Sequence, residues 1–151
     1  MKKCEEQKVT DPESAGLAGL VLDAQPRLLG GIEGSETLID SIKVFVRSMG
    51  TLGVPLCVTE QVPDKLGSTE EGILEACPGS PIFPKDSFSA FGCPNFDEWI
   101  SVCGTEHLLI TGIETPICVY LTAVDAVRRG LTVTILTDCV GCRRPEDGTW
   151  A

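Results

Sequence analysis

The sequence predicts a three-layer α/β/α fold, in which a mostly parallel sheet lies between two layers of helices. Short apolar runs of strand length alternate with segments whose apolar residues recur at helical spacing, and this alternation is typical of βαβ units. Several of these runs end in polar residues, which is where sites form in parallel sheets. The chain has 151 residues, the length of one domain. We therefore expect one domain over residues 16–151, preceded by a polar tail over residues 1–15.

The first half of the chain predicts two strands and two helices. Residues 17–22 form an apolar run that is typical of a strand buried on both faces. A helix is expected over residues 35–49, because its apolar residues lie on one side and Gly50 follows them. Residues 54–59 predict the second strand, and a short helix is expected over residues 70–77.

The middle of the chain predicts an edge segment and one helix. Residues 81–84 have the sequence PIFP, and the two prolines confine this extended segment to a sheet edge or a loop. Asn95 and Glu98 have the spacing of a capping box, so we expect a helix from Asn95 to Cys103.

A strand over residues 107–111 and a helix over residues 116–129 are expected next. Thr115 is a good N-cap, and Pro116 suits the first helical position. Cys118 then lies in the first turn, where amide N–H groups and the helix dipole favour negative charge. A thiol in this place is expected to ionise below its free pKa of about 8.5, as a nucleophile should.

The last predicted strand covers residues 131–137, which are rich in β-branched side chains and are followed by Asp138. Residues 143–147 then bring a proline and two acids, the pattern of a helix start. Because the sequence stops shortly afterwards, we expect the C-terminal flank of the fold to be truncated.

Composition argues against several classes of protein. Hydrophobic residues make up 42% of the chain, which excludes general disorder. The net charge is −10 and the pI is about 4.5, which disfavours nucleic acid and anionic membranes as partners. The N-terminus is charged and lacks an apolar signal region, and no run approaches the roughly 18 apolar residues of a membrane span. We therefore expect a cytoplasmic protein with no nucleic-acid or membrane partner.

Cys118 needs a proton acceptor if it is to act as a nucleophile. His107 is the single histidine and starts a strand, at the opposite edge of the sheet from Cys118, so we interpret it as structural. The common Cys/His type of zinc site lacks ligands in this chain. Asp23 ends a strand that should be central, where a buried carboxylate is costly unless it is paired. Lys85 lies among apolar residues and is a candidate partner for Asp23.

Polar residues that follow the predicted strands are expected to converge on one edge of the sheet. The members of this set are Asp23, Glu60, residues 112–118 and Asp138.

Three blocks carry a resemblance to a known family. They are residues 19–25 (GLVLDAQ), residues 85–91 (KDSFSAF) and residues 112–119 (GIETPICV). With these blocks, the chain resembles the isochorismatase-like cysteine hydrolases, which include isochorismatases, nicotinamidases and N-carbamoylsarcosine amidohydrolases. The likeness runs from about residue 16 to residue 147. Residues 59–67 look most like a poorly characterised subgroup of isochorismatase-domain proteins.

The resemblance implies a Rossmann-like fold and a catalytic triad of Asp23, Lys85 and Cys118. It also implies a cis peptide bond between Ile113 and Glu114, and an oxyanion hole made by the backbone N–H groups of Glu114 and Cys118. In such a site Asp23 takes the thiol proton, Cys118 attacks a carbonyl carbon and forms a thioester, and Lys85 stabilises the ionised pair.

Departures from the family pattern narrow the interpretation. Nicotinamidases of the family bind a metal through an Asp and two histidines near the second strand, and here residues 60–64 contain no histidine. We therefore expect a metal-independent hydrolase without a cofactor, which cleaves a small amide-type C–N bond. Family habit implies a homo-oligomer. Family members also continue with a further helix, a strand and usually a last helix.

Three alternatives stay open from the sequence. One is the vinyl-ether cleavage of isochorismatases, which needs Asp23 more than Cys118. Another is a catalytically silent binding module of the same fold. The third is a thiol redox protein that uses Cys139 and Cys142. The substrate is expected to be a small molecule, and its pocket is expected to include Gln25, Glu60, Gln61, Phe88, Thr115 and Ile117.

Overall fold

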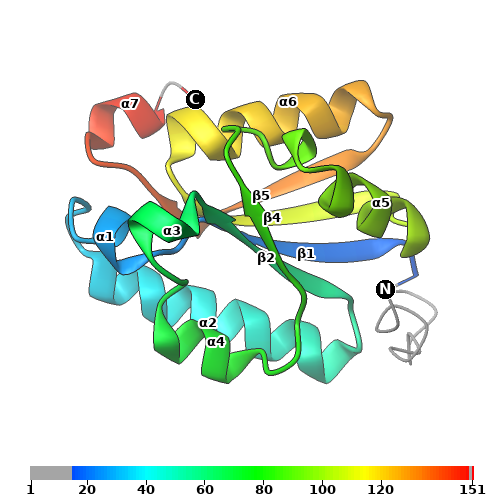
Figure 1. Cartoon of the computed structure of the whole chain (residues 1–151), viewed down its shortest axis with the longest axis horizontal. Helices are drawn as coiled ribbons and strands as arrows, with labels where there is room; N and C mark the ends of the chain where they lie inside the picture. The colour runs from blue at the N-terminus through cyan, green and yellow to red at the C-terminus, as the bar shows by residue number, and fades with distance from the viewer. Residues whose placement is uncertain (1–14, 150) are drawn as a thin grey trace.

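The computed structural model describes residues 15–149 and residue 151. Within these residues, five strands form one sheet in the order β3-β2-β1-β4-β5, and all neighbouring pairs are parallel. Helices cover both faces of the sheet (Figure 1), so the predicted three-layer α/β/α fold is confirmed. The strands are β1 (Leu17–Leu22), β2 (Leu56–Gln61), β3 (Ile82–Lys85), β4 (His107–Ile113) and β5 (Thr132–Gly141).

Two apolar cores separate the sheet from its helical layers. On one face, α2 (Ser35–Leu52) and α4 (Glu71–Ala76) pack against the strands. On the other face, α5 (Pro94–Val102) and α6 (Tyr120–Arg128) enclose the second core. Fully buried side chains include Ile42 and Ile73 in the first core and Leu20, Phe96 and Ile110 in the second.

Each strand is followed by a short helical turn at its carboxyl end. These turns are α1 (Pro26–Leu29) after β1, α3 (Pro63–Leu66) after β2, a 3₁₀ turn η2 (Ala90–Gly92) after β3, a π-helical turn η3 (Thr115–Val119) after β4 and α7 (Pro145–Thr149) after β5. Of these turns, only the helix start near residue 145 was anticipated as a separate element. The carboxyl edge of the sheet is therefore more structured than the sequence pattern indicates.

Two helix boundaries differ from the sequence prediction. Helix α2 continues through Gly50 to Leu52 and is capped by Gly53, which has a φ of 67° and donates its N–H to the carbonyl of Gly50. A residue with positive φ ends a helix better than a glycine that can stay helical. The predicted capping box at Asn95 is wrong, because Cys93 is the N-cap of α5 and Pro94 opens the helix.

The position of Asp138 also differs from the prediction. This residue lies inside β5 and does not follow the strand. Strand β5 bulges against β4: Ile110 pairs with Ile135, and Gly112 pairs with Val140, so β5 takes three more residues to cover the same length of β4. The expectation that Asp138 joins the other polar strand-end residues is therefore wrong.

Other features of the chain agree with expectation or lie outside the described part. Residues 17–22 form β1 as predicted, and residues 82–85 form an edge strand. Residues 1–14 of the expected polar tail lie outside the described residues. No helix in the described part of the chain has the length and apolar character needed to cross a bilayer.

Candidate active site

Asp23 lies immediately after the central strand β1 and is 1% exposed. Its φ of 52° turns the chain away from the strand direction toward α1. Its Oδ1 accepts a hydrogen bond from the Thr59 hydroxyl at 2.7 Å, and its Oδ2 accepts one from Lys85 Nζ at 2.8 Å. A carboxylate buried to this degree is stable only with such partners. Its two oxygens are thus held by the two strands on one side of β1.

Lys85 ends the edge strand β3, yet it is only 5% exposed. Its Nζ donates to Asp23 and to the side-chain oxygen of Gln61 at 2.5 Å. The carbonyls of Ser87 and Phe88 also accept from it, at 2.9 Å and 3.1 Å, because the loop after β3 folds back over the ammonium group. Polar atoms from three chain segments thus replace the water that this buried charge has lost.

Cys118 comes from the opposite side of Asp23, in the turn η3 after β4. It is 8% exposed, it hydrogen-bonds Asp23 through its side chain, and its sulfur lies 4.0 Å from Lys85 Nζ. The backbone N–H of Glu114 donates to the same sulfur. The predicted residues Asp23, Lys85 and Cys118 therefore lie together in the structure.

The backbone path to Cys118 has two special features. The peptide bond between Ile113 and Glu114 is cis, as the resemblance implied. Just before it, Gly112 has a φ of 110°, and a Cβ at this position would overlap the backbone of Leu22. Only glycine fits there, because both the dihedral angle and the close approach exclude a side chain. Strands β1 and β4 can therefore bring Asp23 and Cys118 together.

The pKa of Cys118 corrects the expectation of an acidic thiol. Burial is the largest cause that raises its pKa from 9.0 to about 12, and the negative charge of Asp23 is the next. Lys85 and the Glu114 N–H lower the pKa of Cys118, but by less than burial and Asp23 raise it. Moreover, Thr115 is not the N-cap of a regular helix, because it opens a π-helical turn whose N-cap is Glu114. The resting thiol is thus neutral, with a carboxylate beside it that can take its proton.

The expected pocket residues fall into two groups. Gln25 is fully buried, and its side-chain amide forms hydrogen bonds with the backbone of Gln61 and of Gly67. Glu60 is 7% exposed and accepts from the N–H and hydroxyl of Thr69. The side-chain oxygen of Gln61 holds Lys85, as described above. These three residues therefore support the loops around the triad with their polar groups.

The second group lies nearer to Cys118 along the chain. Thr115 and Ile117 belong to η3 and are partly buried. Phe88 is 58% exposed, and its carbonyl accepts from Lys85. Sequence reasoning missed Thr59 as a partner of Asp23. Thr59 lies two residues before the end of β2 and reaches Asp23 because it pairs with Leu22 in the register of the sheet, which no local sequence signal shows.

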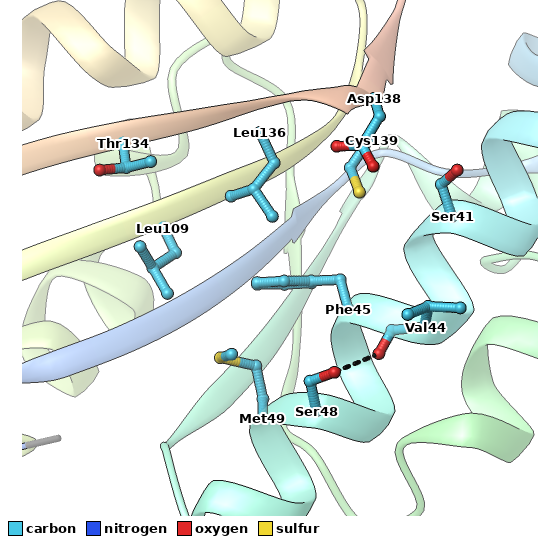
Figure 2. Close-up of a pocket in the computed structure, with 10 residues that line it drawn as sticks. All are labelled: Ser41, Val44, Phe45, Ser48, Met49, Leu109, Thr134, Leu136, Asp138 and Cys139. Carbon is cyan, nitrogen blue, oxygen red and sulfur yellow. Dashed lines mark hydrogen bonds between the residues drawn. The ribbon is translucent and has the colours of Figure 1, made fainter.

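The remaining candidates lie elsewhere. Asp138 and Cys139 line a mostly apolar groove of about 500 Å³ between β5 and α2 (Figure 2), on the face of the sheet opposite the core that contains Cys118. Cys139 and Cys142 are both free thiols. His107, at the other end of β4, pairs with the Thr134 hydroxyl at 2.8 Å. Among the described residues, no group of three or more His, Cys, Asp and Glu side chains is placed to hold a metal ion.

A model of the isochorismatase domain matches residues 18–151 of this chain. The chain belongs to the isochorismatase domain family. This isochorismatase-domain chain is 31% identical over 144 residues to isochorismatase family protein 1B of Dictyostelium discoideum, a match that covers 90% of the chain and 67% of that relative. It is 29% identical over 130 residues to isochorismatase domain-containing protein 1 of Danio rerio, covering 85% of the chain and 45% of the relative. The chain therefore spans less than half the length of this second relative.

A solved structure has a similar fold. The MAR1 ribonuclease of Caenorhabditis elegans superposes with a TM-score of 0.84 at 28% identity, over 91% of this chain and 70% of that one. The domain thus shares its parallel sheet and flanking helices with that structure.

Proposed function

We propose that this isochorismatase-domain protein is a cysteine hydrolase that cleaves a small amide-type C–N bond through a thioester on Cys118. The observation that carries the proposal is the buried chain of hydrogen bonds from Lys85 through Asp23 to Cys118. A carboxylate anchored by an ammonium group on one side and bonded to a thiol on the other is an arrangement of base and nucleophile. The proposed reaction uses no metal and no organic cofactor.

In the first half of the reaction, Asp23 acts as the base. It accepts the thiol proton while the sulfur of Cys118 bonds to the amide carbonyl carbon and the π electrons move to the oxygen. The N–H groups of Glu114 and Cys118 stabilise the oxyanion, an interaction worth about 3–4 kcal/mol per donor in comparable sites. A thiol with a pKa of about 12 suits this order, because its proton leaves only when the attack begins.

In the second half, Asp23 first acts as an acid. It protonates the leaving nitrogen, the C–N bond breaks and the amine departs, which leaves the thioester. Asp23 then takes a proton from water, the water oxygen attacks the thioester carbon, and the C–S bond breaks. The thiolate recovers its proton from Asp23, so that amide and water have given a carboxylic acid and an amine. Lys85 stabilises Asp23 in each of its carboxylate states.

The substrate contacts are proposed for the residues near Cys118 that have side-chain surface to offer. Phe88 is a candidate for substrate contact because it is 58% exposed on the loop that holds Lys85. Thr115 and Ile117 are candidates because they lie in the same turn as Cys118. Gln25, Glu60 and Gln61 are proposed to position this pocket, because their polar groups are bonded within the protein. The expectations of a cytoplasmic homo-oligomer stay predictions.

The test is a hydrolysis screen with matched variants. Small primary amides, N-carbamoyl amino acids and nicotinamide are incubated with the wild-type protein, Cys118→Ala and Asp23→Asn, and amine release is measured. A short RNA belongs in the panel because one structural relative is described as a ribonuclease, and its cleavage is followed by gel electrophoresis because it would release no amine. We expect amine release by the wild-type protein alone, and a thioester on Cys118 that appears in the mass spectrum after acid quenching.

Other outcomes of these assays would indicate one of the alternative functions. Vinyl-ether cleavage of isochorismate that survives Cys118→Ala but not Asp23→Asn would replace amide hydrolysis by the isochorismatase reaction. Disulfide exchange that survives Cys118→Ala but not Cys139→Ala would indicate a redox protein. Absence of any turnover, together with a Cys118 thiol indifferent to Asp23, would indicate a silent binding module.

A further inference from the structure

Arg143 is bonded to the residue that would supply one oxyanion donor. It follows β5 by two residues, and Glu114 follows the neighbouring strand β4, whose last residue Ile113 pairs with Gly141. Nε and one terminal nitrogen of Arg143 each lie 2.7 Å from Glu114 Oε1, and its backbone N–H donates to Oε2 at 3.3 Å. Both carboxylate oxygens of Glu114 are therefore held by one residue of the adjacent strand end.

The setting of this pair distinguishes it from ordinary surface ion pairs. The Glu114 side chain is only 14% exposed, although that of Arg143 is 62% exposed. The aliphatic stem of Arg143 packs over Gly31, where an added Cβ would lie 3.1 Å from Arg143 Cδ. The aliphatic stem of Arg143 is thus held against Gly31, and its guanidinium group is held by the Glu114 carboxylate. A planar fork with a packed stem positions a carboxylate more firmly than a mobile lysine does.

The remaining contacts of Glu114 lead directly to Cys118. Its N–H donates to the sulfur, and its carbonyl accepts from the N–H groups of Ile117 and Val119 at 3.1 Å and 3.2 Å. The backbone of Glu114 is therefore fixed by η3 on its carbonyl side, and its side chain is fixed by Arg143.

We propose that Arg143 is a positioning residue, which aims the Glu114 N–H at Cys118 and at the oxyanion by holding the Glu114 carboxylate. This proposal rests on the proposed function for its catalytic meaning. It makes a prediction about the thiol that needs no substrate. Because the Glu114 N–H lowers the pKa of Cys118, a misdirected N–H leaves less thiolate at a given pH.

The test is the rate of Cys118 alkylation by iodoacetamide at pH 9, resolved by peptide mass spectrometry in the full chain. Arg143→Met keeps the stem and removes the fork, Arg143→Lys keeps the charge, and Arg128→Met is the control. Arg128 is also an exposed arginine, and its terminal nitrogen lies 3.6 Å from Asp125 on α6. We expect both Arg143 variants to react about tenfold more slowly than the wild type, as for one weakened bond to a charged group. The control should react at the wild-type rate.

A double variant shows whether Arg143 acts through Glu114. In a Glu114→Gln background, Arg143→Met should cause no further slowing. Additive slowing, or a wild-type rate for Arg143→Lys, would overturn the positioning role, since the effect would then come from elsewhere or from charge alone. Wild-type rates for both Arg143 variants would also overturn it. If Asp23→Asn still changes the rate in that last case, the triad stands and only the role of Arg143 fails.

Discussion

Two cysteine–aspartate pairs in this molecule have the same thiol pKa but different surroundings. Burial, the charge of Asp138 and a hydrogen bond to Asp138 raise the pKa of Cys139 to about 12. Burial and Asp23 raise the pKa of Cys118 to the same value. The first pair faces α2 from the edge strand β5, and the second lies at the carboxyl end of the central strands.

The difference lies in what would hold the charge once the proton has moved. Asp23 is 1% exposed and is anchored by Lys85 and Thr59, whereas Asp138 is exposed. Lys85 and the Glu114 N–H act on Cys118 to lower its pKa, and no such causes act on Cys139. A raised thiol pKa therefore does not separate a structural cysteine from a nucleophile. The presence of an anchored base and of donors for negative charge does.

The largest expected difference between the two pairs is in turnover. Cys118→Ala should lower amide hydrolysis by at least about 10³-fold, because removal of a nucleophile that acts in a unit with its base removes most of the catalysis. Cys139→Ala should leave the rate within about twofold. Amine release from the best substrate of the screen measures both. Equal losses in the two variants would remove the distinction between the pairs.

The aspartates give the next largest difference. Asp23→Asn should slow hydrolysis by about 10²–10⁴-fold, because asparagine cannot take the thiol proton. Asp138→Asn is the matched control and should retain wild-type activity. Steady-state kinetics on the same substrate checks this, and the expected loss is in kcat. A loss confined to KM would point to substrate binding by Asp23 instead.

A buried and an exposed ion pair should contribute differently to the free energy of unfolding. Lys85→Met should cost about 3–5 kcal/mol in the free energy of unfolding, because it leaves Asp23 buried without its cation. Arg128→Met, which breaks the exposed pair with Asp125, should cost no more than about 1 kcal/mol. Urea denaturation followed by circular dichroism measures both. Similar midpoints for the two variants would show that Asp23 is not held as described.

The smallest expected effect is a loss of stability at alkaline pH. Both thiols have folded-state pKa values of about 12, above the ordinary value of 9.0, so the folded state binds more protons than the unfolded state between these values. Their contribution is fully present below pH 9 and is lost as the pH rises toward 12. Thermal unfolding at pH 8, 9, 10 and 11 should show this decline, and Cys139→Ala should make it shallower. An unchanged slope would contradict the raised pKa of Cys139.

The common edge of parallel strands predicted that Asp23 and Cys118 would lie together, and the family resemblance added Lys85 to them as a triad. Asp23, Lys85 and Cys118 each follow or end a strand, and these three strands bring them together. Asp138 was misplaced because the bulge in β5 depends on pairing with β4, which no local pattern encodes.

The electrostatics of the site could not be predicted from the sequence. The thiol pKa was expected to be low from its place in a helical turn, but burial by neighbouring segments dominates it. The role of Thr59 depends on the register between β1 and β2, and that of Arg143 on the register between β4 and β5. Such effects come from contacts between distant segments, which spacing along the chain does not show.

The most direct test of the central claim is the pH dependence of Cys118 alkylation in the wild type and in Asp23→Asn, with Cys139 as the internal reference. Asp23 raises the pKa of Cys118 through its charge and its hydrogen bond, so its neutralisation should move the Cys118 curve to lower pH and leave the Cys139 curve in place. Superimposable Cys118 curves in the two proteins would contradict the claim that Asp23 and Cys118 form one catalytic unit.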